Sequence, residues 1–126
     1  MHLEALTEKG KQLLPKFAKL PAGFYLAGGT ALALQIGHRI SVDFDFFVET
    51  EIEESLLRRI KKIFSDETVT SSINNPDELT VFIDDTKATF IKYPFPVVRP
   101  FVNFEGIQML GMVELAVTKA YTIGRR

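Results

Sequence analysis

The sequence contains no cysteine, no tryptophan and only two histidines. The missing thiols exclude a disulfide framework and a thiolate zinc site, and they agree with a cytoplasmic protein. His38 has no histidine or cysteine partner at a metal-binding spacing, so it is typical of a helix-end hydrogen-bonding residue. No apolar stretch approaches the ~20 residues that a membrane span needs. The first residues also lack the basic-then-apolar layout of a signal peptide.

An excess of charge of one sign is also lacking, because 15 basic and 16 acidic residues give a formal net charge of −1. Global electrostatic attraction to nucleic acid therefore does not follow. A local basic cluster, formed by Arg58, Arg59, Lys61 and Lys62, is typical of a solvated helix face; its alternative role is contact with an RNA backbone. The length of 126 residues and the 46% hydrophobic content predict one domain over 1–126 with a sizeable core.

The hydrophobic periodicity predicts an α+β fold, with a small mixed sheet flanked by helices. Helices are expected over 4–20, 30–36, 51–64 and 113–123, and strands over 24–27, 41–48, 68–73, 79–83, 88–92 and 104–110. Pro15 should kink or restart the first helix, and Gly37 should end the second. Asp84 and Asp85 should lie at the tip of a hairpin, where a solvated turn accounts for their charge.

Two aspartates, Asp43 and Asp45, lie one residue apart in a run rich in valine and phenylalanine. Because side chains alternate between the faces of a strand, the carboxylates should share one face and Val42, Phe44 and Phe46 the other. Two carboxylates on a buried strand repel each other and lose hydration unless a cation neutralises them. Oxygen ligands suit a hard ion, so the pair predicts a site for Mg²⁺ or Mn²⁺.

A second motif, Gly28-Gly29-Thr30, stands between a predicted strand and a predicted helix. Such a bend leaves backbone N–H groups free at the positive end of the helix dipole, where an anion can approach closely. Thr30 would cap the helix or offer its hydroxyl to a phosphate. Taken alone, the motif is more typical of a tight turn with a threonine cap.

The spacing of the two motifs is more informative than either motif alone. One short helix and a return strand fit between Gly29 and Asp43, so both motifs could meet at one end of the sheet. Phosphates at a helix start beside a metal held by two carboxylates describe a site for a nucleoside triphosphate. The Asp-x-Asp pattern also occurs in sugar-transferring enzymes and in aspartate-nucleophile phosphatases. The phosphatases usually have Thr or Val two residues after the second aspartate, and Phe47 argues against them.

The stretch FYLAGGTALAL over 24–34, followed by GHRISVDFDFF over 37–47, closely resembles the AbiEii/AbiGii-type nucleotidyltransferases. These enzymes are a minimal branch of the DNA-polymerase-beta-like superfamily. The similarity is thinner over 52–94 and returns in ELAVTKA over 114–120, which looks like the family's lysine-bearing helix. The resemblance implies metal-dependent transfer of a nucleoside monophosphate from a nucleoside triphosphate to a hydroxyl of RNA or protein. It also implies a link to toxin–antitoxin or phage-defence systems, with an antitoxin as a partner.

The resemblance also implies roles for individual residues. Gly28 and Gly29 would hold the nucleotide phosphates, while Asp43 and Asp45 would bind the divalent metal and act in catalysis. Three further residues would contact the nucleotide or its phosphates: Arg39, Ser41 and Lys119. Arg39 has an equal alternative, which is an ion pair with one of the two aspartates.

The sequence departs from the family pattern at two points, and both argue against a fully active enzyme. The superfamily usually supplies a third carboxylate from a later strand, as general base or second-metal ligand, and Thr89 stands at the matching position. The family's C-terminal helical region should also be lacking after Arg126. The sequence thus leaves two alternatives to the active enzyme. One is an inactive nucleotide-binding or interaction module, and the other is a fragment whose remaining part lies on another chain.

Overall fold

The structure, a computed structural model, describes residues 1–95, 97, 101–111 and 115. Its helices are η1 (Leu3–Ala5, a 3₁₀ turn), α1 (Glu8–Phe17), α2 (Gly28–Ile36) and α3 (Leu56–Ile63). Its strands are β1 (Tyr25–Ala27), β2 (Phe44–Val48), β3 (Val69–Asn74), β4 (Glu78–Ile83), β5 (Thr86–Lys92), β6 (Val102–Phe104) and β7 (Ile107–Met109). Within this described part, each helix is too short or too polar to cross a bilayer.

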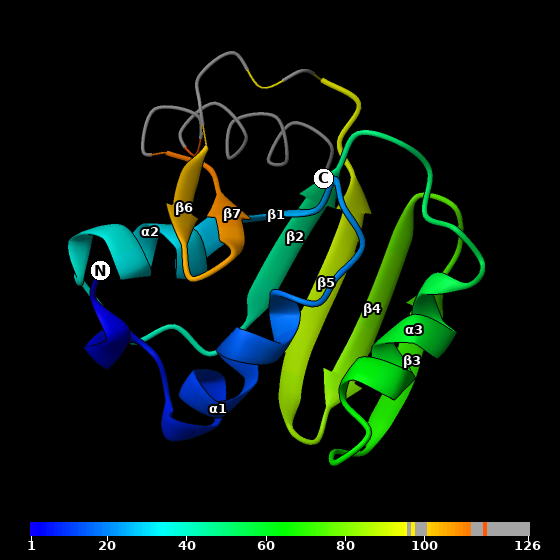
Figure 1. Cartoon of the computed structure of the whole chain (residues 1–126), viewed down its shortest axis with the longest axis horizontal. Helices are drawn as coiled ribbons and strands as arrows, with labels where there is room; N and C mark the ends of the chain where they lie inside the picture. Colours follow the sequence, from blue (N-terminus) through cyan, green and yellow to red (C-terminus); the bar gives the residue numbers. More distant parts are fainter. Residues whose placement is uncertain (96, 98–100, 112–114, 116–126) are drawn as a thin grey trace.

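The strands form one mixed sheet, which confirms the predicted α+β fold. Among the described residues, seven strands pair in the order β3-β4-β5-β2-β1-β7-β6 (Figure 1). β2 runs parallel to β5 and antiparallel to β1, and these pairings place it near the middle of the sheet. A strand with neighbours on both sides has its backbone fixed by two ladders, which makes β2 a rigid support for a functional side chain.

One face of the sheet is covered by α1 and α3, which lie over different parts of it in Figure 1. Phe17 of α1 packs on Phe44 and Phe46 of β2, with ring centroids 4.7 and 4.9 Å apart. Phe17 also contacts Phe64 at the end of α3, at 5.0 Å. These large rings exclude water from the helix-covered face and supply much of its hydrophobic stabilisation. Because side chains alternate along β2, Asp45 points to the opposite face.

The opposite face carries its own aromatic cluster beside Asp45. Phe47, two residues along β2, stacks on Tyr93 with centroids 5.0 Å apart and contacts Tyr25 edge-on at 6.1 Å. Tyr25 in turn packs on Phe101 at 4.9 Å. Asp45 therefore lies at the end of an apolar row on its face of the sheet.

Three predicted boundaries are wrong. The strand expected over 41–48 begins only at Phe44, and Val42, expected on one strand face with Phe44 and Phe46, is 58% exposed. The helix expected over 51–64 begins at Leu56, because the preceding segment is tied by the Ile52 N–H to the carbonyl of Pro76, at 2.8 Å. The single strand expected over 104–110 is a hairpin of β6 and β7, turned at Glu105 and Gly106, both with positive φ.

The predicted strands and hairpin over 68–92 and the short helix before Gly37 agree with the structure, whereas the first helix differs. The helix expected over 4–20 is divided into η1 and α1, and α1 continues through Pro15 without restarting. Gly37 ends α2 with the left-handed backbone expected of a helix-terminating glycine. Asp84 and Asp85 form the turn between β4 and β5. The helix expected over 113–123 falls outside the described residues, except for Leu115, which is buried.

Candidate functional site

The glycine bend and the aspartate strand meet at one end of the sheet. β1 pairs antiparallel with β2 so that Ala27 is the partner of Asp45, and α2 begins at the next residue, Gly28. Gly28 has a φ of +66°, and a Cβ atom added to it would lie 2.7 Å from Oδ2 of Asp45. The carboxylate of Asp45 therefore occupies the space that a side chain at position 28 would need.

The first turn of α2 begins at the glycine bend, where its backbone N–H groups lie at the positive end of the helix dipole. Ala27 is the residue before the helix and makes no side-chain cap, so the expected capping role of Thr30 is wrong. A Cβ atom added to Gly29 would lie 2.7 Å from Nη2 of Arg39, which places this guanidinium directly against the bend. Helix-end N–H groups beside a guanidinium form an environment suited to an anion.

Thr30 instead reaches the segment before β2. Its hydroxyl donates a hydrogen bond to the backbone carbonyl of Asp43 and lies 2.5 Å from the hydroxyl of Ser41. Ser41 is also anchored through its N–H, which donates to the carbonyl of Ala5 at 2.7 Å, and it bridges to Leu6. Sequence reasoning missed this network, because nothing in local spacing indicates that the first residues run beside Ser41.

The two aspartates have different environments. Asp45 is partly buried within β2, whereas Asp43 is exposed in the segment that precedes the strand. The expectation that both carboxylates project from one buried strand is therefore wrong. The strand begins later than predicted, at Phe44, where its pairing with β5 starts; the backbone carbonyl of Asp43 instead accepts a hydrogen bond from Thr30.

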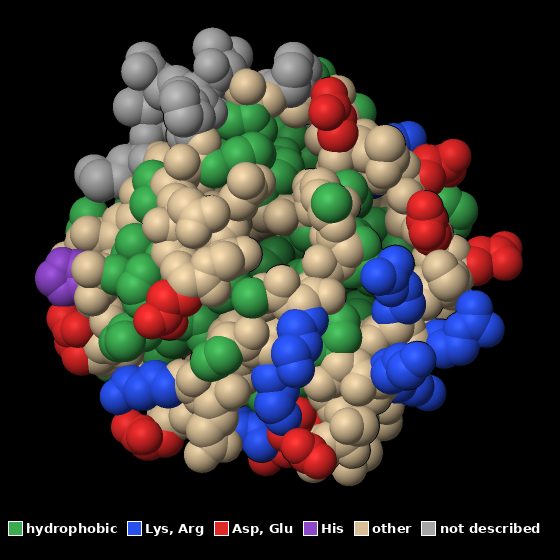
Figure 2. All heavy atoms as spheres, in the orientation of Figure 1, with side chains coloured by type: hydrophobic (Ala, Val, Ile, Leu, Met, Phe, Trp, Pro, Cys, Tyr) green, Lys and Arg blue, Asp and Glu red, His purple; other side chains and the backbone are tan. Residues whose placement is uncertain are grey.

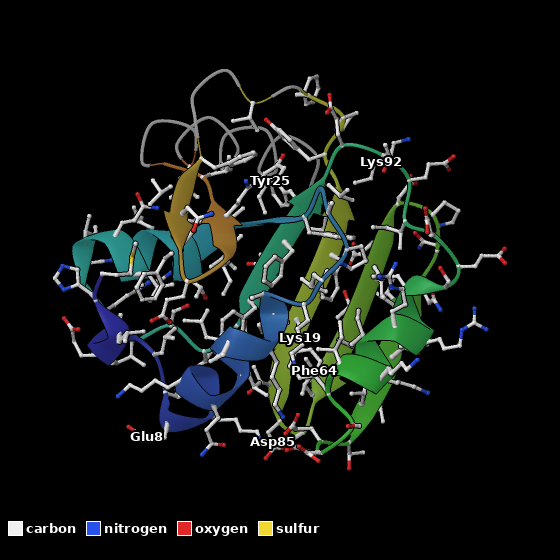
Figure 3. All side chains as sticks on the ribbon, viewed as in Figure 1. Glu8, Lys19, Tyr25, Phe64, Asp85 and Lys92 are labelled. Atoms are coloured by element: carbon white, nitrogen blue, oxygen red, sulfur yellow. The ribbon has the colours of Figure 1, made fainter. Side chains whose placement is uncertain are left out.

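Thr89, at the position expected for a third carboxylate, is the register partner of Asp45 on β5 and is 6% exposed. Asp84 does not replace it, because its carboxylate bonds to Nζ of Lys9 at 2.6 Å and to the N–H of Thr68 at 2.9 Å. Asp85 lies at the hairpin tip (Figure 3), four residues before Thr89 and so roughly 13 Å along the strand. Over the described residues, no cluster of three acidic, histidine or cysteine side chains could hold a metal.

The donors present fit one hard cation better than two. Asp43 and Asp45 supply only carboxylate oxygens, and Mg²⁺ is commonly held by one or two carboxylates together with water and substrate phosphates. Gly28 lies against Asp45 and Gly29 lies against Arg39, so a phosphate at the bend would lie near the carboxylate of Asp45. The residues therefore fit a single Mg²⁺ or Mn²⁺ that a bound nucleotide would help to coordinate.

The remaining predicted residues lie away from this cluster or cannot be placed. Lys119 falls outside the described residues, and His38 is exposed after the end of α2. The basic cluster of α3 is exposed, and Figure 2 shows blue side chains gathered over that part of the helix-covered face. Because Asp45 points to the other face, this basic cluster is separate from the site; its contact with RNA stays a prediction.

A surface hollow of about 980 Å³ is found elsewhere, at the start of α3. It is lined by side chains of both charges, including Glu51, Glu53 and Arg58, and by none of the predicted site residues. The site at the bend is instead open to solvent through the exposed Asp43 and Arg39. We therefore place the candidate site by its chemistry, at the bend.

Comparison with known proteins finds relatives in sequence and in fold. A protein of Aquifex aeolicus (strain VF5), called uncharacterized protein aq_aa25, is 34% identical over 131 residues. This alignment covers 98% of the chain but 62% of the Aquifex protein. The crystal structure of JHP933 from Helicobacter pylori shares the fold, with a TM-score of 0.62 at 20% identity, over 90% of this chain and 57% of that one.

A second Helicobacter pylori structure, provisionally named a nucleotidyltransferase, has a TM-score of 0.63 at 20% identity. It is matched over 94% of this chain and 59% of its own. The chain thus spans about three fifths of the length of these relatives. The model of one family, described as nucleotidyl transferase AbiEii toxin of type IV toxin–antitoxin systems, matches residues 12–118. The chain is therefore a member of the AbiEii nucleotidyltransferase toxin family.

Proposed function

We propose that this chain binds a nucleoside triphosphate together with one divalent cation and transfers its nucleoside monophosphate to a hydroxyl of RNA or protein. The observation that carries the proposal is the contact between the glycine bend and Asp45, 2.7 Å from a Cβ that Gly28 lacks. Anion-binding groups beside cation-binding groups suit a ligand that carries both a phosphate and a metal. A nucleoside triphosphate with Mg²⁺ is such a ligand.

The residues of the proposed site have two roles, phosphate binding and cation binding. The N–H groups of Gly28 and Gly29 and the guanidinium of Arg39 would bind the triphosphate, and Asp43 and Asp45 would hold the cation. When bound, the cation would neutralise charge on the phosphate oxygens during transfer. The acceptor oxygen would bond to the α-phosphorus, pyrophosphate would leave, and the hydroxyl proton would be released. Ser41 and Lys119 are proposed as further nucleotide contacts on the strength of the family resemblance.

The partner of the chain is proposed from the family alone. Membership of a type IV toxin–antitoxin family supports an antitoxin as partner. RNA or protein as acceptor is proposed from the family resemblance. The relatives are longer than this chain. We therefore treat the acceptor and its binding as proposals.

A second candidate is a module that binds nucleotide without transferring it. The register pairing of Thr89 with Asp45 favours this reading, because a threonine hydroxyl is a poor general base and a poor replacement for a carboxylate ligand. Incubation with each labelled nucleoside triphosphate and with RNA or protein acceptors distinguishes the two. Binding with label transfer supports the enzyme, and binding without transfer supports the module.

The first test is calorimetry with Mg²⁺ and each nucleoside triphosphate. Asp43→Asn and Asp45→Asn should each weaken metal-dependent nucleotide binding by about tenfold or more, since even outer partners of metal ligands contribute ~10–100-fold. Asp85→Asn, which neutralises an exposed acid at the distant hairpin tip, is the matched control and should bind as the wild type does. Equal binding by all four chains would refute the assignment of the two aspartates.

A further inference from the structure

The exposed Asp43 lacks the support that β2 gives to Asp45. The ladder with β5 begins at the pair Phe44 and Ala88, and the ladder with β1 ends at the pair Ala27 and Asp45. Asp43 therefore precedes both ladders. A carboxylate on such a segment needs another anchor if it is to hold a cation at a fixed place.

That anchor is Thr30 in the first turn of α2. Its side chain is 2% exposed, and its hydroxyl donates to the backbone carbonyl of Asp43 itself. A carbonyl oxygen only accepts, so the single hydroxyl hydrogen of Thr30 is used in this bond. The contact with Ser41, at 2.5 Å, must then have the Ser41 hydroxyl as donor. Thr30 accordingly has no hydrogen left to donate to a phosphate.

We infer that Thr30 is a positioning residue, whose buried hydroxyl ties the backbone of Asp43 to the same helix that begins at the glycine bend. One helix, α2, then supports both parts of the proposed site. Its first residues, Gly28 and Gly29, would bind the phosphates, and its third residue, Thr30, holds the backbone of Asp43. The inference rests on the proposed function, because it assigns to Asp43 the binding of a cation.

The test compares Thr30→Val, which removes the hydroxyl at nearly constant volume, with Thr30→Ser, which keeps it. Thr86→Val, at a buried threonine in the β4–β5 hairpin, controls for the loss of a buried hydroxyl elsewhere. The first measurement is the affinity of the full chain for Mn²⁺ alone. T30V should raise the dissociation constant about fivefold or more, while T30S and T86V stay within about twofold of the wild type.

The second measurement is amide hydrogen exchange at residues 42–44 without metal. T30V should exchange faster there than the wild type and T86V, because the segment has lost its anchor. Wild-type exchange in T30V, or equal losses of affinity in T30V and T86V, would overturn the inference. If T30V does not fold, Thr30→Cys, whose thiol is a weak donor, replaces it in both measurements.

The two measurements separate this inference from the proposed function. A wild-type chain that binds no Mn²⁺ even with a nucleoside triphosphate present, or an Asp43→Asn chain that binds it equally well, contradicts the proposed function. The exchange comparison still decides whether Thr30 holds Asp43. Intact Mn²⁺ binding that depends on Asp43 but not on Thr30 contradicts the inference alone.

Discussion

At the scale of single residues, Gly28 links the backbone conformation of the bend to the position of Asp45. Its φ of +66° is a left-handed conformation that is unfavourable for residues with a Cβ atom. The space where a Cβ would stand is filled by Oδ2 of Asp45, at 2.7 Å. Any substitution there must strain the backbone and displace the carboxylate, so the glycine couples the bend to the proposed cation ligand.

Gly28→Ala should therefore lower both stability and metal binding. The left-handed strain and the clash together should reduce the free energy of unfolding by about 2–4 kcal/mol. Gly23→Ala is the matched control, because Gly23 also has positive φ, +102°, but its added Cβ would meet only Val48, at an ordinary 3.7 Å. It should lose about 1–2 kcal/mol and keep wild-type Mn²⁺ affinity. Urea unfolding and calorimetry measure the two effects, and equal Mn²⁺ affinities in both variants would contradict the coupling.

Sequence reasoning could predict the meeting of Gly28 with Asp45, because strand, short helix and return strand leave few ways to connect the two motifs. It could not predict the role of Thr30. A threonine after two glycines at a helix start is most often a cap, and only the path of the segment before β2 reveals Asp43 as its partner. The anchoring of Ser41 by Ala5 depends on a contact across 36 positions of sequence, which local patterns do not encode.

At the scale of elements, the β4–β5 hairpin is tied to α1 by Asp84. The carboxylate accepts hydrogen bonds from Nζ of Lys9 and from the backbone N–H of Thr68. The bond from Lys9, followed by that from Thr68, holds the pKa of Asp84 below its ordinary value. Asp84 also occupies a left-handed turn conformation, with φ of +53°, which asparagine tolerates about as well as aspartate does.

This pKa shift predicts a pH dependence of stability. Because the folded pKa is lowered, the unfolded chain binds the proton first as the pH falls. The stabilisation is complete above the ordinary aspartate pKa of about 4 and is lost as the pH falls through the lower, folded pKa. Asp84→Asn should remove the stabilisation that the ionised carboxylate of Asp84 provides. The wild type should therefore have the higher urea midpoint at neutral pH, and its difference from the variant should narrow as the pH falls. The effect should be small, since both side chains are about one third exposed. A difference that widens at low pH would contradict it.

The element boundaries that sequence reasoning missed have tertiary causes. The apolar stripe that ends in α3 extends back to Ile52, but the backbone there bonds to Pro76 and not to a helical turn. The β6–β7 hairpin turns at Glu105, a residue that seldom adopts positive φ, so its turn signal is weak. By contrast, the β4–β5 hairpin is readily predicted, because two segments with clear strand patterns are separated by the turn-forming residues Asp84 and Asp85.

At the scale of the whole molecule, the order of strands decides which residues can complete the site. β2 lies between β1 and β5, so Asp45 has the bend on one side and Thr89 on the other. The family resemblance identified Thr89 as the residue at the position of the third carboxylate. The register of two parallel strands, which turn chemistry does not fix, is what shows that Thr89 is the direct neighbour of Asp45.

Thr89→Asp should therefore create a third carboxylate next to Asp45. Without metal, the variant should be less stable than the wild type, because a charge is placed at a position only 6% exposed and beside another acid. With Mn²⁺, stability should recover, since binding to the folded state alone stabilises it by RT ln(1 + [Mn²⁺]/Kd).

The measurement is the thermal midpoint as a function of Mn²⁺ concentration. The slope should be steeper for Thr89→Asp than for the wild type, while Thr89→Val, which adds no ligand, should match the wild-type slope. If the chain is a binding module that lacks only this carboxylate, the variant should also gain nucleotide transfer. A variant with the same Mn²⁺ response as Thr89→Val would mean that position 89 does not face the cation, whatever its register with Asp45.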